Sequence, residues 1–191
     1  MARTPSTQRL PLGQPAPDFT LPDPAGKNFR LADLARGKVA VVVFACNHCP
    51  YVVHIRDSLG RVAKEYQPKG VSFVAINSND AARYPDDAPG KMPAFAQAGG
   101  WEFPYLVDAS QEVAKDWHAA CTPDLFVLDQ AGKLAYAGQF DSSRPGNGDP
   151  VSGHDLRQAL DAVLSHRPVP LPQKPSLGCN IKWKPGHEPE P

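Results

Sequence analysis

The sequence predicts an α/β fold, in which a central mixed β-sheet is flanked by helices and the chain ends in two extended arms. Strand-like and helix-like patterns alternate along the middle of the chain, which is typical of α/β domains. The 191 residues include 22 prolines, six of them in the first 24 residues and seven in the last 24. The usual share is about 5%, so this content excludes a long coiled coil or an all-helical bundle.

The alternation begins at residues 39–45, a continuous apolar and β-branched run that predicts a strand buried on both faces. Pro50 suits the first position of a helix, and apolar residues at three- and four-residue spacing extend this helix to Gln67. A second buried strand is expected at 71–77. A short helix that ends near Gly99 follows a polar loop.

The second half of the chain predicts a brief strand at 103–107 and then a helix that Ser110 can cap. Residues 125–129 and 133–138 are two apolar runs joined by a short segment that contains glycine, which predicts an antiparallel hairpin. The sheet is therefore expected to mix parallel and antiparallel strands.

Ser152 and Asp155 have the spacing of a capping box, so the last helix is expected at 153–166. Prolines make both ends of the chain read as irregular. The chain therefore divides into a flexible N-terminal arm at 1–10, a folded domain at 11–167 and a Pro-rich tail at 168–191 that carries Cys179.

Charge and hydrophobicity exclude several classes of protein. The 20 basic and 20 acidic residues balance, which argues against nucleic-acid and polybasic membrane-surface partners. The longest apolar run, Val39 to Cys46, is too short to cross a bilayer, and the first twenty residues lack the apolar stretch of a signal peptide. We therefore expect a cytoplasmic location, where closely spaced cysteines are catalytic or metal-binding more often than structural.

The most informative stretch is Cys46-Asn-His-Cys49, between the first buried strand and the helix that starts at Pro50. Two cysteines at this spacing can form a disulfide, and the thiolate is the reacting species. A helix N-terminus stabilises a thiolate, and Cys49 gains most from it. His48, when protonated, is expected to lower the pKa of either thiol. We expect the junction to be exposed.

A metal site and a purely structural role are the alternatives for this pair. A structural zinc site needs four ligands, normally with a second pair at similar spacing, but Cys121 and Cys179 are far apart in the sequence. We therefore expect no metal and no cofactor, and a zinc-binding or interaction module is an alternative. In the structural role, the two cysteines would be inert and buried.

Cys121-Thr122-Pro123 precedes the 125–129 strand, and an X-Pro bond at such a place can be cis. This pattern resembles the thioredoxin superfamily. The N-terminal stretch Gly13 to Leu21, the Phe44 to Pro50 signature and the Lys174 to Trp183 element are similar to its peroxiredoxin-like, AhpC/TSA-type branch. The resemblance implies a thioredoxin-like fold over about residues 11–185, in which Thr122 and Pro123 bind the backbone of a substrate protein.

The resemblance also implies an activity: a thiol–disulfide oxidoreductase that uses Cys46 and Cys49. Aligned on the Cys-Pro step, the proline, threonine and arginine that shape a peroxiredoxin pocket are replaced by Val42, Cys46 and Pro123. This favours disulfide exchange and makes a thiol peroxidase with Cys49 as its peroxidatic residue the alternative. Cys49 is favoured as nucleophile with Cys46 resolving, and the reverse order stays open.

The remaining candidates are auxiliary. Cys121 is either a small residue in a loop or an extra thiol. Cys179 either folds back as an additional resolving thiol, as in some peroxiredoxins, or packs as a hydrophobic residue with Ile181 and Trp183. We expect a protein or small-molecule disulfide or peroxide as substrate, a thiol as electron donor, and a monomer or homodimer.

Overall fold

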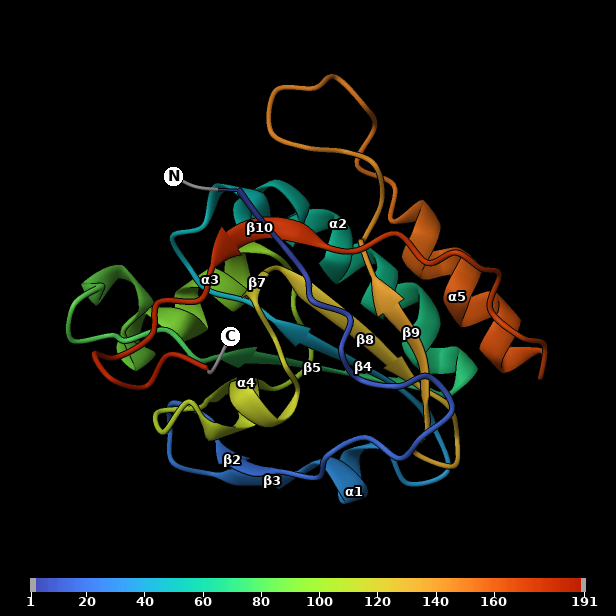
Figure 1. The fold of residues 1–191 in the computed structure, drawn as a ribbon, viewed down its shortest axis with the longest axis horizontal. Helices are drawn as coiled ribbons and strands as arrows, with labels where there is room; N and C mark the ends of the chain where they lie inside the picture. The colour runs from blue at the N-terminus through green and yellow to red at the C-terminus, as the bar shows by residue number, and fades with distance from the viewer. Residues whose placement is uncertain (1–2, 190–191) are drawn as a thin grey trace.

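The computed structural model describes residues 3–189 and confirms the predicted α/β fold with a mixed sheet. Five strands lie in the order β6-β5-β4-β8-β9 (Figure 1). The strands are β4 Val39–Phe44, β5 Val71–Asn77, β6 Tyr105–Val107, β8 Asp124–Leu128 and β9 Leu134–Gly138. β4, β5 and β6 run parallel, β8 pairs antiparallel with β4, and β9 pairs antiparallel with β8.

Helices and a small hairpin cover the two faces of this sheet. One face carries α2 (Pro50–Tyr66), α3 (Met92–Ala98) and α5 (His154–Leu164). The other carries α1 (Leu31–Leu34), α4 (Glu112–Asp116) and the hairpin of β2 (Thr20–Pro22) and β3 (Asn28–Arg30). Three single 3₁₀ turns lie at Gln67–Lys69, Pro85–Asp87 and Pro89–Lys91. Within residues 3–189, no helix has the length and apolarity that a membrane crossing requires.

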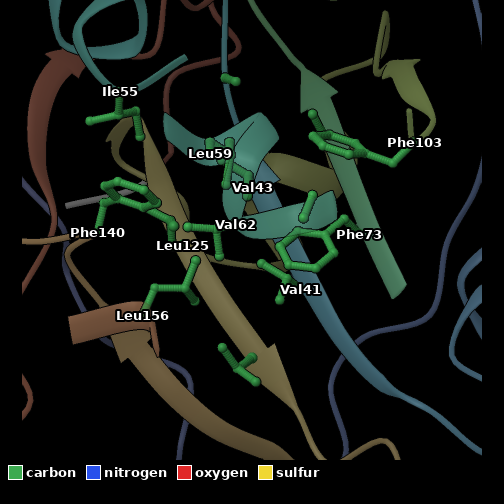
Figure 2. Close-up of a cluster of buried hydrophobic side chains, with 14 of the residues drawn as sticks. Val41, Val43, Ile55, Leu59, Val62, Phe73, Phe103, Leu125, Phe140 and Leu156 are labelled. Atoms are coloured by element: carbon green, nitrogen blue, oxygen red, sulfur yellow. The ribbon is translucent and has the colours of Figure 1, made fainter. Parts of the chain in front are cut away.

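Side chains along β4 point alternately to the two faces of the sheet, so its apolar residues contribute to the hydrophobic core on each face. Every residue of β4 is buried. Val41 and Val43 pack with α2 and α5, and Figure 2 shows this cluster. Val42 and Phe44 point to the opposite face and pack with the hairpin side. A strand buried on both faces was expected from the continuous apolar sequence, and the structure confirms it.

The predicted cap of the last helix is wrong. The N-cap of α5 is Gly153, with φ of 68° and no side-chain cap. The backbone N–H groups of Ser152 and Gly153 both donate to Asp141 Oδ2, at 2.8 and 2.7 Å. A buried carboxylate from the preceding loop thus satisfies donors near the start of the helix. At α4, the N-cap is Gln111. Ser110 Oγ accepts from the N–H of Glu112 at 3.3 Å and donates to Asp108 Oδ1 at 3.1 Å.

The two arms also differ from expectation, because parts of them form strands. β1 (Arg3–Pro5) pairs antiparallel with β10 (Leu177–Asn180), and β10 pairs antiparallel with β7 (Cys121–Thr122). Ser6 continues the contact by donating its N–H to the Ser176 carbonyl at 2.8 Å. The expected flexible and irregular arms are therefore joined through residues 3–6 and 176–180. Their backbone groups pair with each other and with β7, a long-range arrangement that local proline content does not reveal.

Candidate functional site

The pair Cys46 and Cys49 lies where β4 ends and α2 begins. Cys49 is the N-cap residue of α2 and Pro50 is in its first turn, as the sequence predicts. Both cysteines are free thiols with 0% of their surface exposed. The junction is therefore exposed only in part: Pro50 is exposed and Asn47 and His48 are half-buried, whereas distant segments of the chain cover both sulfurs.

One covering segment is β7 with the proline that follows it. The Thr122–Pro123 peptide bond is cis, as predicted. Cys46 Sγ lies 3.4 Å from Thr122 Oγ1, and the Cys49 thiol donates a hydrogen bond to the Thr122 carbonyl oxygen at 3.1 Å. Thr122 therefore contacts both members of the pair, one with its side chain and the other with its backbone.

The second covering segment is the tail strand β10. Cys179 lies opposite Thr122 in the strand register and is 2% exposed. Its thiol hydrogen-bonds to the sulfur of Cys49. It belongs to the core cluster of the pair, whereas Ile181 and Trp183 pack on the opposite side of the sheet. Of the two possibilities left open for Cys179, the structure favours the thiol beside the pair.

These contacts favour Cys49 as the thiolate. Hydrogen bonds lower the pKa of Cys49 to about 5, although burial opposes the change. The largest contribution is the hydrogen bond from the Cys46 thiol. Smaller ones come from the Cys179 thiol, the backbone N–H of Val52 and the Thr122 hydroxyl. The Thr122 carbonyl oxygen also opposes it, since it can accept only from the protonated thiol. Donors outnumber this acceptor, so the thiolate is stabilised.

The two neighbouring cysteines respond in the opposite direction. The hydrogen bond between Cys46 and Cys49 is the largest cause that raises the pKa of Cys46 well above its ordinary value, and burial is the second. Burial, followed by the hydrogen bond to Cys49, raises the pKa of Cys179 to about 12. At neutral pH the cluster therefore has one thiolate, Cys49, and two thiols that donate to it. This supports Cys49 as the nucleophile.

His48 does not act on the thiols as the sequence predicts. Its Nδ1 lies 2.6 Å from Asp87 Oδ2, and its ring stacks on Tyr84 with centroids 5.7 Å apart. The main interactions that set the pKa of Cys49 come from other groups. His48 therefore anchors the loop between the two cysteines through Asp87.

Asp87 is a site residue that the sequence analysis missed. Its Oδ1 accepts the backbone N–H groups of Asn47 and His48, at 2.7 and 3.2 Å, and its Oδ2 also accepts from Asn79 at 2.8 Å. The carboxylate fixes the two residues between the cysteines. It comes from a polar loop with no motif, so only the tertiary structure brings it here.

Cys46, His48 and Asp87 also form a possible cation cluster, with ligand atoms within 4.8 Å of one another. A structural zinc ion needs four ligands and deprotonated thiols. This cluster supplies three, the Asp87 oxygens already accept four hydrogen bonds, and Cys46 is held as a thiol. The residues do not fit a structural zinc ion.

Cys121 is buried but turned away from the pair. Its Sγ lies 3.5 Å from the Pro123 carbonyl oxygen. Burial raises its pKa well above the ordinary value, so it is held as a thiol. Among the cysteines, Cys46, Cys49 and Cys179 form the cluster, and Cys121 lies outside it.

Asp124, which follows Pro123, is a second residue that the sequence analysis did not single out. It is fully buried, and its Oδ2 accepts from Ser6 Oγ at 3.0 Å and from the Ala120 N–H at 3.3 Å. Among residues 3–189 its Oδ1 has no hydrogen-bond partner. Burial raises the pKa of Asp124 to about 7.

Most of this chain matches a known protein family. The family model described as AhpC/TSA matches residues 12–137. A protein named "Putative peroxiredoxin" from Mycobacterium tuberculosis is 31% identical over 147 residues, which cover 69% of this chain and 86% of that protein. The thiol-disulfide oxidoreductase ResA of Geobacillus thermodenitrificans is 28% identical over 123 residues, 64% of this chain and 66% of its own length.

Solved structures agree with the sequence matches. The crystal structure of an uncharacterized conserved protein from Geobacillus kaustophilus has a TM-score of 0.93 and 52% identity, and covers 97% of this chain and 98% of that one. Further thioredoxin-like structures match with TM-scores of 0.66 and 0.63. The predicted thioredoxin-like fold and the predicted family resemblance are both confirmed.

Proposed function

Because the chain belongs to the AhpC/TSA family, we propose that it is a thiol–disulfide oxidoreductase that cycles Cys46 and Cys49 between two thiols and a disulfide. The observation that carries this proposal is the geometry at the start of α2. Cys49 is the N-cap residue, and its sulfur receives hydrogen bonds from the Cys46 and Cys179 thiols. This arrangement stabilises the form of cysteine that attacks disulfides.

The reaction has two exchange steps. The Cys49 thiolate attacks one sulfur of a substrate disulfide, forms a mixed disulfide and releases the first substrate thiolate, which takes up a proton. Cys46 then loses its proton, attacks the Cys49 sulfur and releases the second substrate thiol. The substrate gains two electrons and two protons, and the chain gains the Cys46–Cys49 disulfide. A thiol donor reverses the change and restores the pair.

The two cysteines suit different steps. The hydrogen bond to the Cys49 thiolate is the largest cause of the raised pKa of Cys46. Once Cys49 is in a mixed disulfide, this acceptor is lost and the pKa of Cys46 falls. The second thiol is therefore held protonated until the first has reacted.

A redox titration tests the assignment. Wild type is treated with oxidised glutathione, alkylated and mapped by mass spectrometry, alongside Cys46→Ser, Cys49→Ser, Cys121→Ser and Cys179→Ser. We expect wild type to form the Cys46–Cys49 disulfide. Cys49→Ser should reduce oxidised glutathione about 100-fold or more slowly, since it lacks the sulfur at the helix N-terminus and the pair that completes the exchange. Cys121→Ser is the matched control and keeps the wild-type rate. Unchanged glutathione reduction by Cys49→Ser contradicts the proposal.

Peroxide reduction is the second candidate, and the burial of the pair favours it. A small hydroperoxide needs less space than a protein disulfide to reach sulfurs that are 0% exposed. The Cys49 thiolate and one proton would convert the peroxide to an alcohol or water and leave Cys49 sulfenic acid. The Cys46 thiol would condense with it to the disulfide and water. The wild type and the same four variants are treated with a hydroperoxide in place of oxidised glutathione, and rapid dimedone labelling of Cys49 distinguishes this reaction.

A further inference from the structure

The tail strand β10 lies on the edge of β7, immediately before the cis-proline. The pairing is antiparallel, with Cys179 opposite Thr122 and Asn180 opposite Cys121, and β1 pairs with the other edge of β10. Figure 1 shows β10 beside β7. An extended peptide recognised by a sheet edge adds to it in this way, with main-chain hydrogen bonds fixing its register. The chain's own tail therefore occupies the place of such a peptide.

Gly178 shows how closely the tail fits this edge. A Cβ atom at this position would lie 2.0 Å from the Thr122 carbonyl oxygen and 2.6 Å from the Thr122 carbonyl carbon. Both are backbone atoms, so no side-chain rotation can relieve the overlap. Only glycine allows β10 to approach the residue that contacts both Cys46 and Cys49.

This fit directs a thiol at the reactive sulfur. Cys179, the next residue, is 2% exposed and hydrogen-bonds to Cys49. Cys121 is equally buried on the neighbouring strand, but its sulfur faces the Pro123 carbonyl oxygen. The contact between Cys179 and Cys49 is thus a property of β10 and not of cysteines in this region generally.

We propose that β10 is an internal substrate strand and that Cys179 is a third redox thiol, the disulfide partner that the fold itself supplies to Cys49. The step is an exchange within the chain. The Cys179 thiol loses its proton and attacks Cys49 in the Cys46–Cys49 disulfide, and Cys46 leaves as a thiolate that takes up a proton. One disulfide replaces another, so no external oxidant or reductant is consumed.

The internal strand also defines the substrate class. A protein disulfide that binds the β7 edge must first displace β10, whereas a small disulfide or peroxide does not need that edge. We therefore infer that protein disulfides compete with the tail for the β7 edge, whereas small oxidants need only a local opening of β10 to reach the sulfurs. This inference rests on the proposed function only in taking Cys49 as the reactive thiolate.

The test uses Cys46→Ser, in which Cys49 cannot pair with Cys46. The full-length variant is oxidised with oxidised glutathione, alkylated and digested, and its disulfides are mapped by mass spectrometry. We expect a Cys49–Cys179 disulfide in most molecules. Cys46→Ser/Cys121→Ser is the matched control and keeps this disulfide, while Cys46→Ser/Cys179→Ser stops at the Cys49–glutathione mixed disulfide. Wild type at partial oxidation provides a second measurement, in which a minor Cys49–Cys179 cross-link is expected.

The outcomes separate this inference from the proposed function. If wild type forms the Cys46–Cys49 disulfide but Cys179 stays free in Cys46→Ser, the internal-substrate role is overturned and the oxidoreductase proposal stands. If Cys49 reacts in neither protein, both are overturned. A Cys49–Cys121 disulfide in Cys46→Ser also overturns the inference, because it would show that β10 does not select the partner.

Discussion

At the scale of single residues, the reactivity of Cys49 depends on which groups donate to its sulfur. Thiolates in proteins are commonly stabilised by a helix N-terminus or a neighbouring cation. Here the N-cap position is present, but His48 is committed to Asp87. Two other thiols provide the stabilisation instead, and the largest part comes from Cys46.

Removing these donors is therefore expected to raise the pKa of Cys49 from about 5. Cys46→Ala should raise the pKa of Cys49 by about one unit or more, and Cys179→Ala by less, because a thiolate that loses a hydrogen-bond donor is stabilised less relative to the thiol. The pH dependence of Cys49 alkylation by iodoacetamide, followed by peptide mapping, measures the midpoint. Cys121→Ala serves as the control with an unchanged midpoint. A larger increase in Cys179→Ala than in Cys46→Ala would contradict the ranking.

At the scale of elements, the site is assembled where three segments meet: the start of α2, the β7 strand with its cis-proline, and β10. The first two follow β4 and precede β8, which are adjacent antiparallel strands of the central sheet. β10 is not part of the central sheet and pairs instead with β7 and β1. It is therefore the covering element that can leave while the sheet stays intact.

Gly178→Ala is expected to open the pair without changing any sulfur. The added methyl group would overlap the Thr122 carbonyl group, and an overpacked contact costs about 1–3 kcal/mol, so β10 should detach more often. We expect Cys49 alkylation at pH 8 to be faster by about tenfold or more. Gly90→Ala, at a glycine with open space around it, should leave the rate unchanged. Equal rates in wild type and Gly178→Ala would mean that β10 does not control access.

At the scale of the whole molecule, both arms and the central sheet converge on Asp124. Ser6 from the N-terminal arm hydrogen-bonds its carboxylate, and Ser176 from the tail accepts the N–H of the next residue, Leu125, at 3.4 Å. Neither set of contacts neutralises the charge. Burial therefore favours the protonated form of the Asp124 carboxyl group, and these hydrogen bonds do not fully offset that effect.

The Asp124 carboxyl group should make the free energy of unfolding decrease as the pH rises. The pKa of Asp124 is about 7 in the folded protein and near 4 in an unfolded chain, so the folded state binds the proton more tightly. Its contribution is fully present below about pH 4 and is lost as the pH rises to about 7, a change of up to about 4 kcal/mol in the free energy of unfolding. Urea unfolding at several pH values measures it.

Asp124→Asn provides the comparison, because the amide does not titrate. The stability of wild type minus that of Asp124→Asn should decrease between pH 4.5 and 8. Cys49, with its lowered pKa, contributes an opposite slope at higher pH, but it is present in both proteins and cancels. A difference that does not vary with pH would show that Asp124 is not protonated near neutrality.

Features that depend on neighbouring residues follow from the sequence alone. The apolar run 39–45 and Pro50 placed Cys49 at a helix start, and the family motifs indicated the fold and the cis-proline. Period and helix-end chemistry are local, so they can be read directly from the chain. The capping box at Ser152 was wrong because Asp141, a more distant residue, takes the N–H groups at that helix start.

The surroundings of the pair, in contrast, depend on tertiary contacts. Asp87 engages His48 from a loop without a motif, and β10 brings Cys179 to Cys49 across most of the length of the chain. The proline-rich tail looked irregular because proline content reports local backbone preference, whereas strand pairing depends on a distant edge that is free to accept it. The sequence thus predicted the candidate redox cysteines, and the fold determined the groups that contact and cover them.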